Sequence, residues 1–304
     1  MPNNKDLVSI ASFTKDEVLN IFRLADDPYF FKKRSDLFRG KVLGSVFYCE
    51  STRTRAGFSS AFLRLGGQVL DFSRNSTHTE DAFKESFIDT GSIIGDYCDL
   101  SVVRLDEEHE FTAFCQGSSS PCISAGYTTS EHPTQSLIDI YALYRYLSNL
   151  DDVNLLIYSS PKWGVITSLI LGLGLFSSAT IHIVHPASDG LSNYFQNHSH
   201  LIDIDIRHYQ SLDDLYSSGA NAMINSVYVG APNIALNDYS QYPIFDLNVL
   251  SRFPLSPIVL SPLPRSISIS TEVDASKCAK YFEQSKWGLN VRGAILQHMA
   301  HRII

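Results

Sequence analysis

Three short segments combine side chains that could bind an anion and polarise a carbonyl group. The first is Ser51-Thr-Arg-Thr-Arg55, which follows an apolar run and precedes a helical pattern. Backbone N–H groups at a helix start favour negative charge, and three hydroxyls with Arg53 would add hydrogen-bond donors. The segment therefore indicates a phosphate site, although an N-capping hydroxyl beside solvated arginines explains it about equally well.

The second segment is His132-Pro-Thr-Gln135, which opens the predicted helix Ser136–Leu147. Pro133 suits a first helical turn. A neutral histidine beside a glutamine amide can donate to a carbonyl oxygen and accept from an NH2 group. Taken alone, the segment is more simply a helix cap.

The third segment is Ser261-Pro-Leu-Pro-Arg265, which follows the predicted strand Ile258–Leu260. Its two prolines fix φ and leave the carbonyls of Pro262 and Leu263 outside helical hydrogen bonding. A rigid loop of this kind can present acceptors to an amine, with Arg265 as its anchor. By itself it is an ordinary turn.

The elements that must position these segments alternate between apolar, β-branched runs and amphipathic helical patterns. This alternation predicts an α/β fold with two doubly wound parallel-sheet domains and an active-site cleft between them. Apolar runs mark the expected strands: Lys41–Cys49, Gly67–Phe72, Leu100–Arg104, Pro121–Ser124, Val153–Tyr158, Thr180–Val184, Ile202–His208, Ala222–Val227 and Ile258–Leu260. The expected helices include Thr52–Leu65, Ala82–Tyr97 and Pro133–Tyr146. A polar break places the domains at 1–147 and 148–286, and the terminal helix 287–304 would pack back on the first domain.

Composition excludes several classes of protein. The 304 residues are 44% hydrophobic and 18% charged, which is typical of a globular chain. Against 24 Lys and Arg stand 32 Asp and Glu, so the net charge of −8 disfavours nucleic acid and acidic membranes as partners. Five scattered cysteines without a C-x-x-C pair, and an N-terminus without a secretory pattern, predict reduced thiols in a cytoplasmic protein.

No cofactor or metal is predicted. The histidines of the second half lack the H-E-x-x-H spacing of a zinc site, and no strand is followed by a G-x-G-x-x-G or P-loop segment.

Taken together and in this order, the three segments resemble the aspartate/ornithine carbamoyltransferase family. The similarity is closest to the aspartate branch, with a divergent acceptor site. It covers the stretches Phe47–Phe72, Glu85–Arg104, Ser124–Leu143, Pro262–Arg265 and Tyr281–Arg292. The family resemblance implies a homotrimer whose substrates are carbamoyl phosphate and a small amine.

The resemblance also implies roles for individual residues. The phosphate would be held by Ser51, Thr52, Arg53 and Thr54. The carbamoyl carbonyl would be polarised by Thr54, Arg104 and His132. The carbamoyl NH2 would be held by Gln135, Leu263 and Pro264. An amine then attacks, a tetrahedral oxyanion forms and phosphate leaves, a reaction that positioning and electrostatics can drive without a cofactor.

Two regions depart from the family pattern. In the loop Arg74–Glu85, which the family often donates from a neighbouring subunit, Phe83 stands at the lysine position and Thr79 at the serine position, and Lys84 could substitute after a one-residue shift. On the acceptor side, the segments Tyr158–Thr167 and Asn225–Ala231 lack the arginines that clamp aspartate.

The acceptor domain is instead rich in Tyr, Ser and Asn, including Tyr228. Between positions 151 and 250 the fixed cations are Lys162 and Arg207. Lys162 could take one carboxylate, but a solvated loop lysine is at least as good an interpretation. The sequence therefore predicts carbamoyl transfer to an amine other than ordinary aspartate or ornithine. Two alternatives stay open: a catalytically silent scaffold subunit and a divergent aspartate carbamoyltransferase.

Overall fold

The computed structural model describes residues 5–73, 85–127, 130–176, 179–186, 191–231, 243–265 and 267–303, apart from the side chain of Leu201. The chain divides into two compact units, Met1–Thr134 with Trp287–Ile304, and Gln135–Lys286. The sequence pattern set the first boundary after residue 147. The units divide earlier, and the helix that begins at Pro133 groups with the second unit from Gln135 onward.

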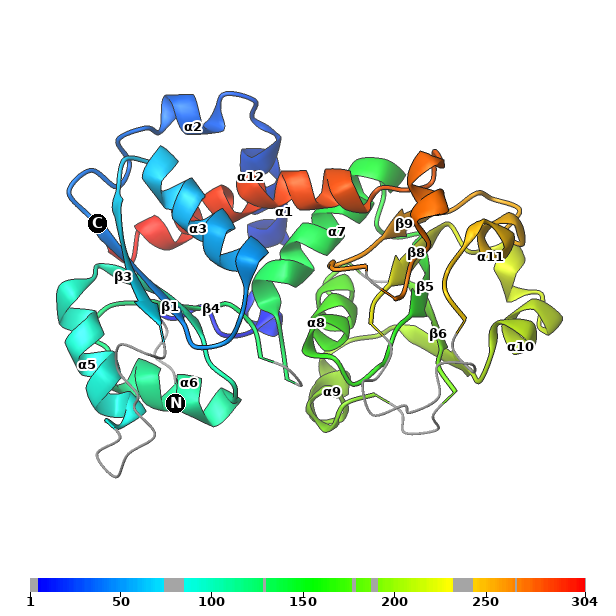
Figure 1. Ribbon diagram of the computed structural model, residues 1–304, viewed down its shortest axis with the longest axis horizontal. Helices are drawn as coiled ribbons and strands as arrows, with labels where there is room; N and C mark the ends of the chain where they lie inside the picture. The colour runs from blue at the N-terminus through cyan, green and yellow to red at the C-terminus, as the bar shows by residue number, and fades with distance from the viewer. Residues whose placement is uncertain are drawn as a thin grey trace. The chain divides into compact units, whose positions relative to one another are not determined.

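The first unit is built on a four-stranded parallel sheet in the order β2-β1-β3-β4 (Figure 1). Right-handed crossovers in this order put α3 on one face and α5 with α6 on the other. Helices α5 and α6 accordingly lie side by side, apart from α3. In chain order the elements are η1 (Ile10–Ser12), α1 (Lys15–Asp26), α2 (Phe30–Lys33), β1 (Val42–Phe47), α3 (Thr52–Arg64), β2 (Gln68–Ser73), α5 (Phe87–Tyr97), β3 (Leu100–Arg104), α6 (Glu108–Gly117) and β4 (Cys122–Ser124).

The second unit is built on a five-stranded parallel sheet in the order β7-β6-β5-β8-β9. Strands β5 and β8 are almost wholly buried, as parallel strands covered on both faces must be. After α7 (Pro133–Leu147) the elements are β5 (Asn154–Tyr158), α8 (Gly164–Leu173), β6 (Thr180–Val184), α9 (Asn193–His198), η2 (Ser199–Leu201), β7 (Asp205–Tyr209), α10 (Leu212–Ser217), η3 (Ala220–Ala222), β8 (Ser226–Val229), α11 (Leu247–Ser251), β9 (Ile258–Leu260), η5 (Thr271–Ala275) and α12 (Tyr281–Ala300).

The predicted fold class, α/β with two doubly wound parallel sheets, is confirmed. Local signals explain many boundaries; α1, for example, begins after Thr14 because Thr14 and Glu17 form a reciprocal capping box. Two helices differ from expectation. Helix α5 begins only at Phe87, where the Ser86 hydroxyl caps the Asp89 N–H. Helix α12 begins at Tyr281, well before the expected Trp287, and ends at Ala300.

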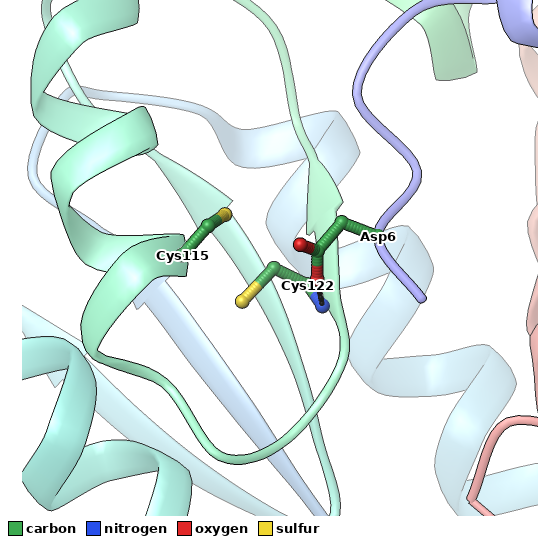
Figure 2. A group of neighbouring side chains, drawn as sticks. All are labelled: Asp6, Cys115 and Cys122. Atoms are coloured by element: carbon green, nitrogen blue, oxygen red, sulfur yellow. Dashed lines mark hydrogen bonds between the residues drawn. The ribbon is translucent and has the colours of Figure 1, made fainter. Parts of the chain in front are cut away.

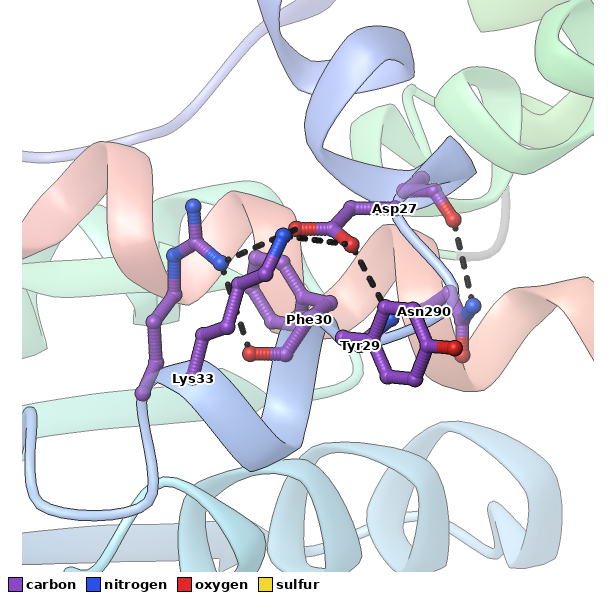
Figure 3. Close-up of polar contacts among 7 residues, drawn as sticks. Asp27, Tyr29, Phe30, Lys33 and Asn290 are labelled. Atoms are coloured by element: carbon purple, nitrogen blue, oxygen red, sulfur yellow. Dashed lines mark hydrogen bonds and ion pairs between the residues drawn. The ribbon is translucent and has the colours of Figure 1, made fainter.

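The terminal half of α12 belongs to the first unit and is tied to the N-terminal helices. Asn290 donates its side-chain amide to the Ala25 carbonyl at 3.1 Å, next to the connection between α1 and α2 (Figure 3). In the same connection Asp27 accepts from the Tyr29 N–H and pairs with Lys33 at 3.0 Å. Farther along, Arg302 Nη1 donates to the Lys5 carbonyl at 2.9 Å. The two ends of the chain therefore stabilise one unit together.

Among the described helices, none combines the length and apolar character needed to span a bilayer. All five cysteines are free thiols.

Candidate functional site

The first sequence segment and Arg104 lie at the carboxyl edge of the first sheet. Strand β1 ends at Phe47 and β3 ends at Arg104, and the parallel register pairs these two residues directly. The strand order reverses between β1 and β3, since β1 connects outward to β2 and the chain then returns to β3. Ligands of open α/β sheets bind at such a reversal point, so Ser51–Arg55 and Arg104 are placed where a ligand is expected.

Helix α3 begins with its first-turn N–H groups unclaimed by a capping side chain. Ser51 occupies the N-cap position, but its hydroxyl makes no capping hydrogen bond. Thr52 and Arg53 are exposed, whereas Thr54 is buried. Arg55 donates Nε to Asp71 at 2.8 Å and forms an ion pair with it. Arg55 is therefore committed to Asp71, while Arg53 is an exposed cation in the first turn of α3, where the helix start favours an anion.

Two guanidinium groups of this edge repel one another. Although the Arg53 side chain is exposed, partial desolvation of its guanidinium lowers the pKa of Arg53, and the positive charge of Arg104 lowers it further. Burial also lowers the pKa of Arg104, although nearby Cys49 and Asp106 oppose this. Arg104 Nη1 donates to the Ala125 carbonyl at 3.5 Å, just beyond β4. Two close cations in a partly buried edge favour a ligand that carries at least two negative charges.

His132 is held as a neutral imidazole at the start of α7. Burial lowers its pKa well below the ordinary value, and the charges of Arg104 and then Arg292 lower it further. Its Nδ1 lies 3.5 Å from the Thr134 hydroxyl. A neutral imidazole surrounded by cations can donate one N–H to a developing negative charge without carrying charge itself. The structure thus places Arg53, Thr54, Arg104 and His132 in one unit.

Gly126 holds the ring of His132 in place. Its φ of +97° is left-handed, and a Cβ built there would lie 2.5 Å from His132 Cγ. Alanine at this position would be strained and would push the ring away. We expect Gly126→Ala to destabilise the fold by about 1–3 kcal/mol and to lower turnover at least about tenfold. Urea unfolding with steady-state kinetics measures both effects, and unchanged turnover would show that the His132 ring position is unimportant.

Arg292 is a buried cation near this site that the sequence patterns did not single out. It is 5% exposed, and its guanidinium lies 5.8 Å from the Phe58 ring centroid. A Cβ on Gly57 would lie 2.9 Å from its Cδ, so the arginine stem packs directly on α3. The sequence feature that could have indicated its burial is its position between Val291 and Ala294. Both of these residues are buried, on the face of α12 that packs on the first unit. Arg292 therefore links α12 to the helix that carries the phosphate segment and adds positive potential at His132.

In the second unit, Gln135 is oriented by a buried carboxylate. Its Nε2 donates to Asp139 Oδ1 at 2.7 Å, and within the described part of the chain its Oε1 has no hydrogen-bond partner. Asp139 also accepts from Gln284 Nε2 at 2.6 Å and from the Tyr228 hydroxyl at 2.7 Å. Because the amide N–H is committed to Asp139, Gln135 presents a carbonyl oxygen, which is an acceptor for an NH2 group.

Gln284 connects this carboxylate to the third sequence segment. Its Oε1 accepts from the Ser261 N–H at 2.9 Å, and the Ser261 hydroxyl accepts from the Leu263 N–H at 3.2 Å. The Leu263–Pro264 peptide is cis, and Leu263 has a φ of +55°. At the far end of the loop Arg265 pairs with Asp274 and lies 5.2 Å from the Phe282 ring centroid. Arg265 is therefore an anchor of the loop, as its sequence position indicated.

Of four further predicted substrate-binding residues, the structure describes Tyr228 and Lys162. Tyr228 is fully buried, its hydroxyl donates to Asp139, and burial followed by the Asp139 charge raises its pKa well above the ordinary value. It stays protonated and supports Asp139, so any effect on a ligand is indirect. Lys162 is exposed on the turn before α8. Thr79 and Lys84 lie outside the described residues.

Removal of the Gln284 side-chain amide tests the buried network. Gln284→Leu leaves the Ser261 N–H and one hydrogen-bonding position of Asp139 without partners in a dry interior. We expect a loss of about 2–4 kcal/mol in the free energy of unfolding. The control is Gln196→Leu, whose amide makes a single bond to the Leu191 carbonyl. This control should lose under about 1.5 kcal/mol of unfolding free energy in the same urea titration. Equal losses for the two variants would show that the hydrogen bonds of Gln284 do not act as a network.

A second group of polar side chains, Asp6, Cys115 and Cys122, has the residue types of a metal centre (Figure 2). Their ligand atoms lie within 4.8 Å of one another, and all three residues are buried. Asp6 already accepts the Cys122 N–H at 2.8 Å. A hydrogen bond with Cys122, followed by burial, raises the pKa of the Cys115 thiol. Metals bind thiolates, which the raised pKa of Cys115 disfavours, and both cysteines pack in the apolar core beneath α6.

Comparisons with known proteins match this arrangement. The family model described as aspartate/ornithine carbamoyltransferase, carbamoyl-P binding domain, matches residues 5–145. The aspartate carbamoyltransferase catalytic subunit of Nitrosopumilus maritimus is 34% identical, over 96% of this chain and 95% of its own. That of Methanocaldococcus jannaschii is 32% identical, over 97% of each chain. A solved structure of the catalytic subunit of M. jannaschii aspartate transcarbamoylase superimposes with a TM-score of 0.84 at 31% identity, covering 98% of both chains.

Proposed function

The chain belongs to the aspartate/ornithine carbamoyltransferase family, and we propose that it transfers the carbamoyl group of carbamoyl phosphate to the amino group of a small acceptor. The observation that carries the proposal is the cluster of Arg53, Arg104 and a neutral His132 at the reversal point of the first sheet. Carbamoyl transfer requires cations that bind the phosphate dianion, which the two arginines would supply. It also requires a donor that polarises the carbonyl, which the neutral imidazole would supply.

In the proposed reaction the first unit binds the phosphate and activates the carbonyl. The first-turn N–H groups of α3, the hydroxyls of Ser51 and Thr52, and Arg53 hold the phosphate oxygens. Thr54, Arg104 and His132 donate to the carbamoyl oxygen. Negative charge develops on that oxygen as the amine attacks, and preorganised donors stabilise it more strongly than the neutral carbonyl.

The carbamoyl NH2 is oriented by acceptors. Gln135 offers Oε1 because Asp139 holds its amide N–H, and Gln284 ties Asp139 to the loop that carries Leu263 and Pro264. The carbonyl of Leu263 would be a second acceptor. Attack by the amine nitrogen forms the new C–N bond, and collapse of the tetrahedral intermediate breaks the bond to phosphate. The leaving phosphate takes the amine proton, so no base beyond the substrate is needed.

The identity of the amine that accepts the carbamoyl group is a separate part of the proposal. The names of the related catalytic subunits point to aspartate, and a divergent aspartate carbamoyltransferase is consistent with them. The comparisons give no support to the expectation of a different amine. That expectation depends on the segments Tyr158–Thr167 and Asn225–Ala231, which carry no arginine. L-aspartate is therefore the first acceptor to assay.

The test is phosphate release from carbamoyl phosphate by the purified chain, with L-aspartate, L-ornithine and a panel of other amines, and with mass spectrometry of the carbamylated product. Transfer to L-aspartate would identify a divergent aspartate carbamoyltransferase, and transfer to another amine would support the changed acceptor site. Binding of carbamoyl phosphate without transfer to any amine would favour the scaffold alternative.

A homotrimer is part of the same proposal, as is a cytoplasmic location. Thr79 and Lys84 would then complete the phosphate site of a neighbouring subunit. Analytical ultracentrifugation of the purified chain tests the assembly, and a monomer that is fully active would remove any need for residues from a second copy.

A further inference from the structure

A cavity of about 350 Å3 lies within the second unit, at the carboxyl edge of its sheet. Tyr158 and Val184 are the last residues of β5 and β6, and Gln210 follows the last residue of β7. Helices α10 and α11 contribute the remaining walls. The volume falls at the lower end of the range for small-molecule sites, and the carboxyl edge of a parallel sheet is where such sites form.

Part of the cavity wall is apolar. It consists of side chains from the ends of β5 and β6, from α10 and α11, and from the loops that flank them: Tyr158, Val184, Pro186, Leu212, Pro243 and Val249. Tyr158 donates its hydroxyl to the Pro243 carbonyl at 2.7 Å, and its ring lies 6.1 Å from that of Phe245. These walls are therefore packed in place and suit an apolar group of the ligand.

One lining residue, Tyr216, carries a polar atom without a hydrogen-bond partner among the described residues. The Tyr216 hydroxyl is buried, and no described residue hydrogen-bonds to it. Burial raises its pKa to about 12, so it stays protonated and can donate. Its ring is fixed by Arg252, 4.3 Å from the ring centroid, and by Phe253. A buried hydroxyl without a partner is uncommon in native structures and requires an explanation, which a bound ligand would supply.

Two opposite charges line the same cavity. Arg252 and Asp213 are both exposed, and neither has an ion-pair partner within 4.0 Å in the described part of the chain. Both act on the Tyr216 hydroxyl, since Arg252 lowers its pKa and Asp213 raises it. Among the described residues, the lining therefore combines apolar side chains with one cation, one anion, the Tyr216 hydroxyl and the neutral polar residues Gln210, Ser211 and Asn248.

We propose that this cavity binds a free α-amino acid with an apolar side chain. The carboxylate would pair with Arg252 and accept from the Tyr216 hydroxyl, the ammonium group would pair with Asp213, and the side chain would contact the apolar walls. None of the residues assigned to carbamoyl transfer lines the cavity. The proposal goes beyond the proposed function and does not depend on it.

The test is titration calorimetry of the full chain, without carbamoyl phosphate, using L-leucine and L-phenylalanine as probes. We expect at least one of them to bind. Its methyl ester, which lacks the carboxylate, and its N-acetyl derivative, which lacks the ammonium charge, should each bind about tenfold more weakly or worse. No binding by either amino acid, or binding of the ester and the N-acetyl derivative as tight as that of the parent amino acid, would overturn the proposal.

Variants locate the binding. Arg252→Gln and Asp213→Asn should each lower the affinity for the amino acid about tenfold. Arg207→Gln is the control and should leave the affinity unchanged, because Arg207 pairs with Asp205 on β7 and lies outside the cavity lining. Tyr216→Phe should weaken binding while leaving the unliganded protein as stable as before, since the hydroxyl it removes has no partner. Retained affinity in Arg252→Gln, or weakening in Arg207→Gln equal to it, would refute this location.

Discussion

Alanine in place of His132 is expected to lower kcat for carbamoyl transfer about 10²–10³-fold, with a much smaller change in the affinity for phosphate. The imidazole is a neutral donor whose hydrogen bond strengthens as the carbonyl oxygen becomes an oxyanion, so its loss falls on the transition state. Steady-state kinetics with the acceptor that the amine panel identifies gives kcat, and phosphate binding by calorimetry gives the affinity. A loss confined to KM would show that His132 binds the ground state instead.

The pH dependence gives this prediction a second readout. The pKa of His132 lies well below 6.5 in the folded chain, because of burial and of Arg104 and Arg292. Below pH 6.5 the unfolded chain therefore binds a proton that the folded chain does not, and the free energy of unfolding rises with pH until it levels off above that value. His132→Ala should remove this contribution. A pH profile of urea unfolding that is identical in the two proteins would contradict the neutral imidazole.

The segments proposed to carry the reaction could be singled out in the sequence because each is local. Ser51–Arg55 and His132–Gln135 combine a helix start with the side chains that a carbamoyl phosphate site uses, so a few consecutive residues contain the signal. The sheet order that brings Arg104 beside the first segment follows from the strand and helix alternation.

The residues that hold these groups in place were not predictable in the same way. Asp139 and Gln284 are 145 positions apart, and their hydrogen bond exists only in the folded unit. In the sequence both are polar residues of amphipathic helices, and periodicity assigns such residues to solvent. Tyr228 was expected at the acceptor for its hydroxyl, but its place in a fully buried strand directs that hydroxyl to Asp139. Long-range burial, which local patterns do not encode, decides all three cases.

Replacement of Arg53 with alanine is expected to lower kcat/KM about 10³-fold, equivalent to about 4 kcal/mol of transition-state stabilisation. The unliganded protein should be no less stable than before. Arg53 is exposed and is repelled by Arg104, so the substitution relieves a like-charge contact. Inorganic phosphate should raise the Tm of the parent protein by mass action, and this increase should be lost in Arg53→Ala.

Arg55→Ala is the matched control, two positions away on the same helix. Arg55 is committed to Asp71 through an ion pair with roughly half-exposed partners, so its removal should cost at most about 1 kcal/mol of stability. The increase in Tm caused by phosphate should survive. The two arginines are thus expected to give opposite results, one affecting the ligand and the other only the fold. The opposite result would be loss of the phosphate-induced increase in Tm in Arg55→Ala and its retention in Arg53→Ala. It would show that Arg55, and not Arg53, binds the phosphate.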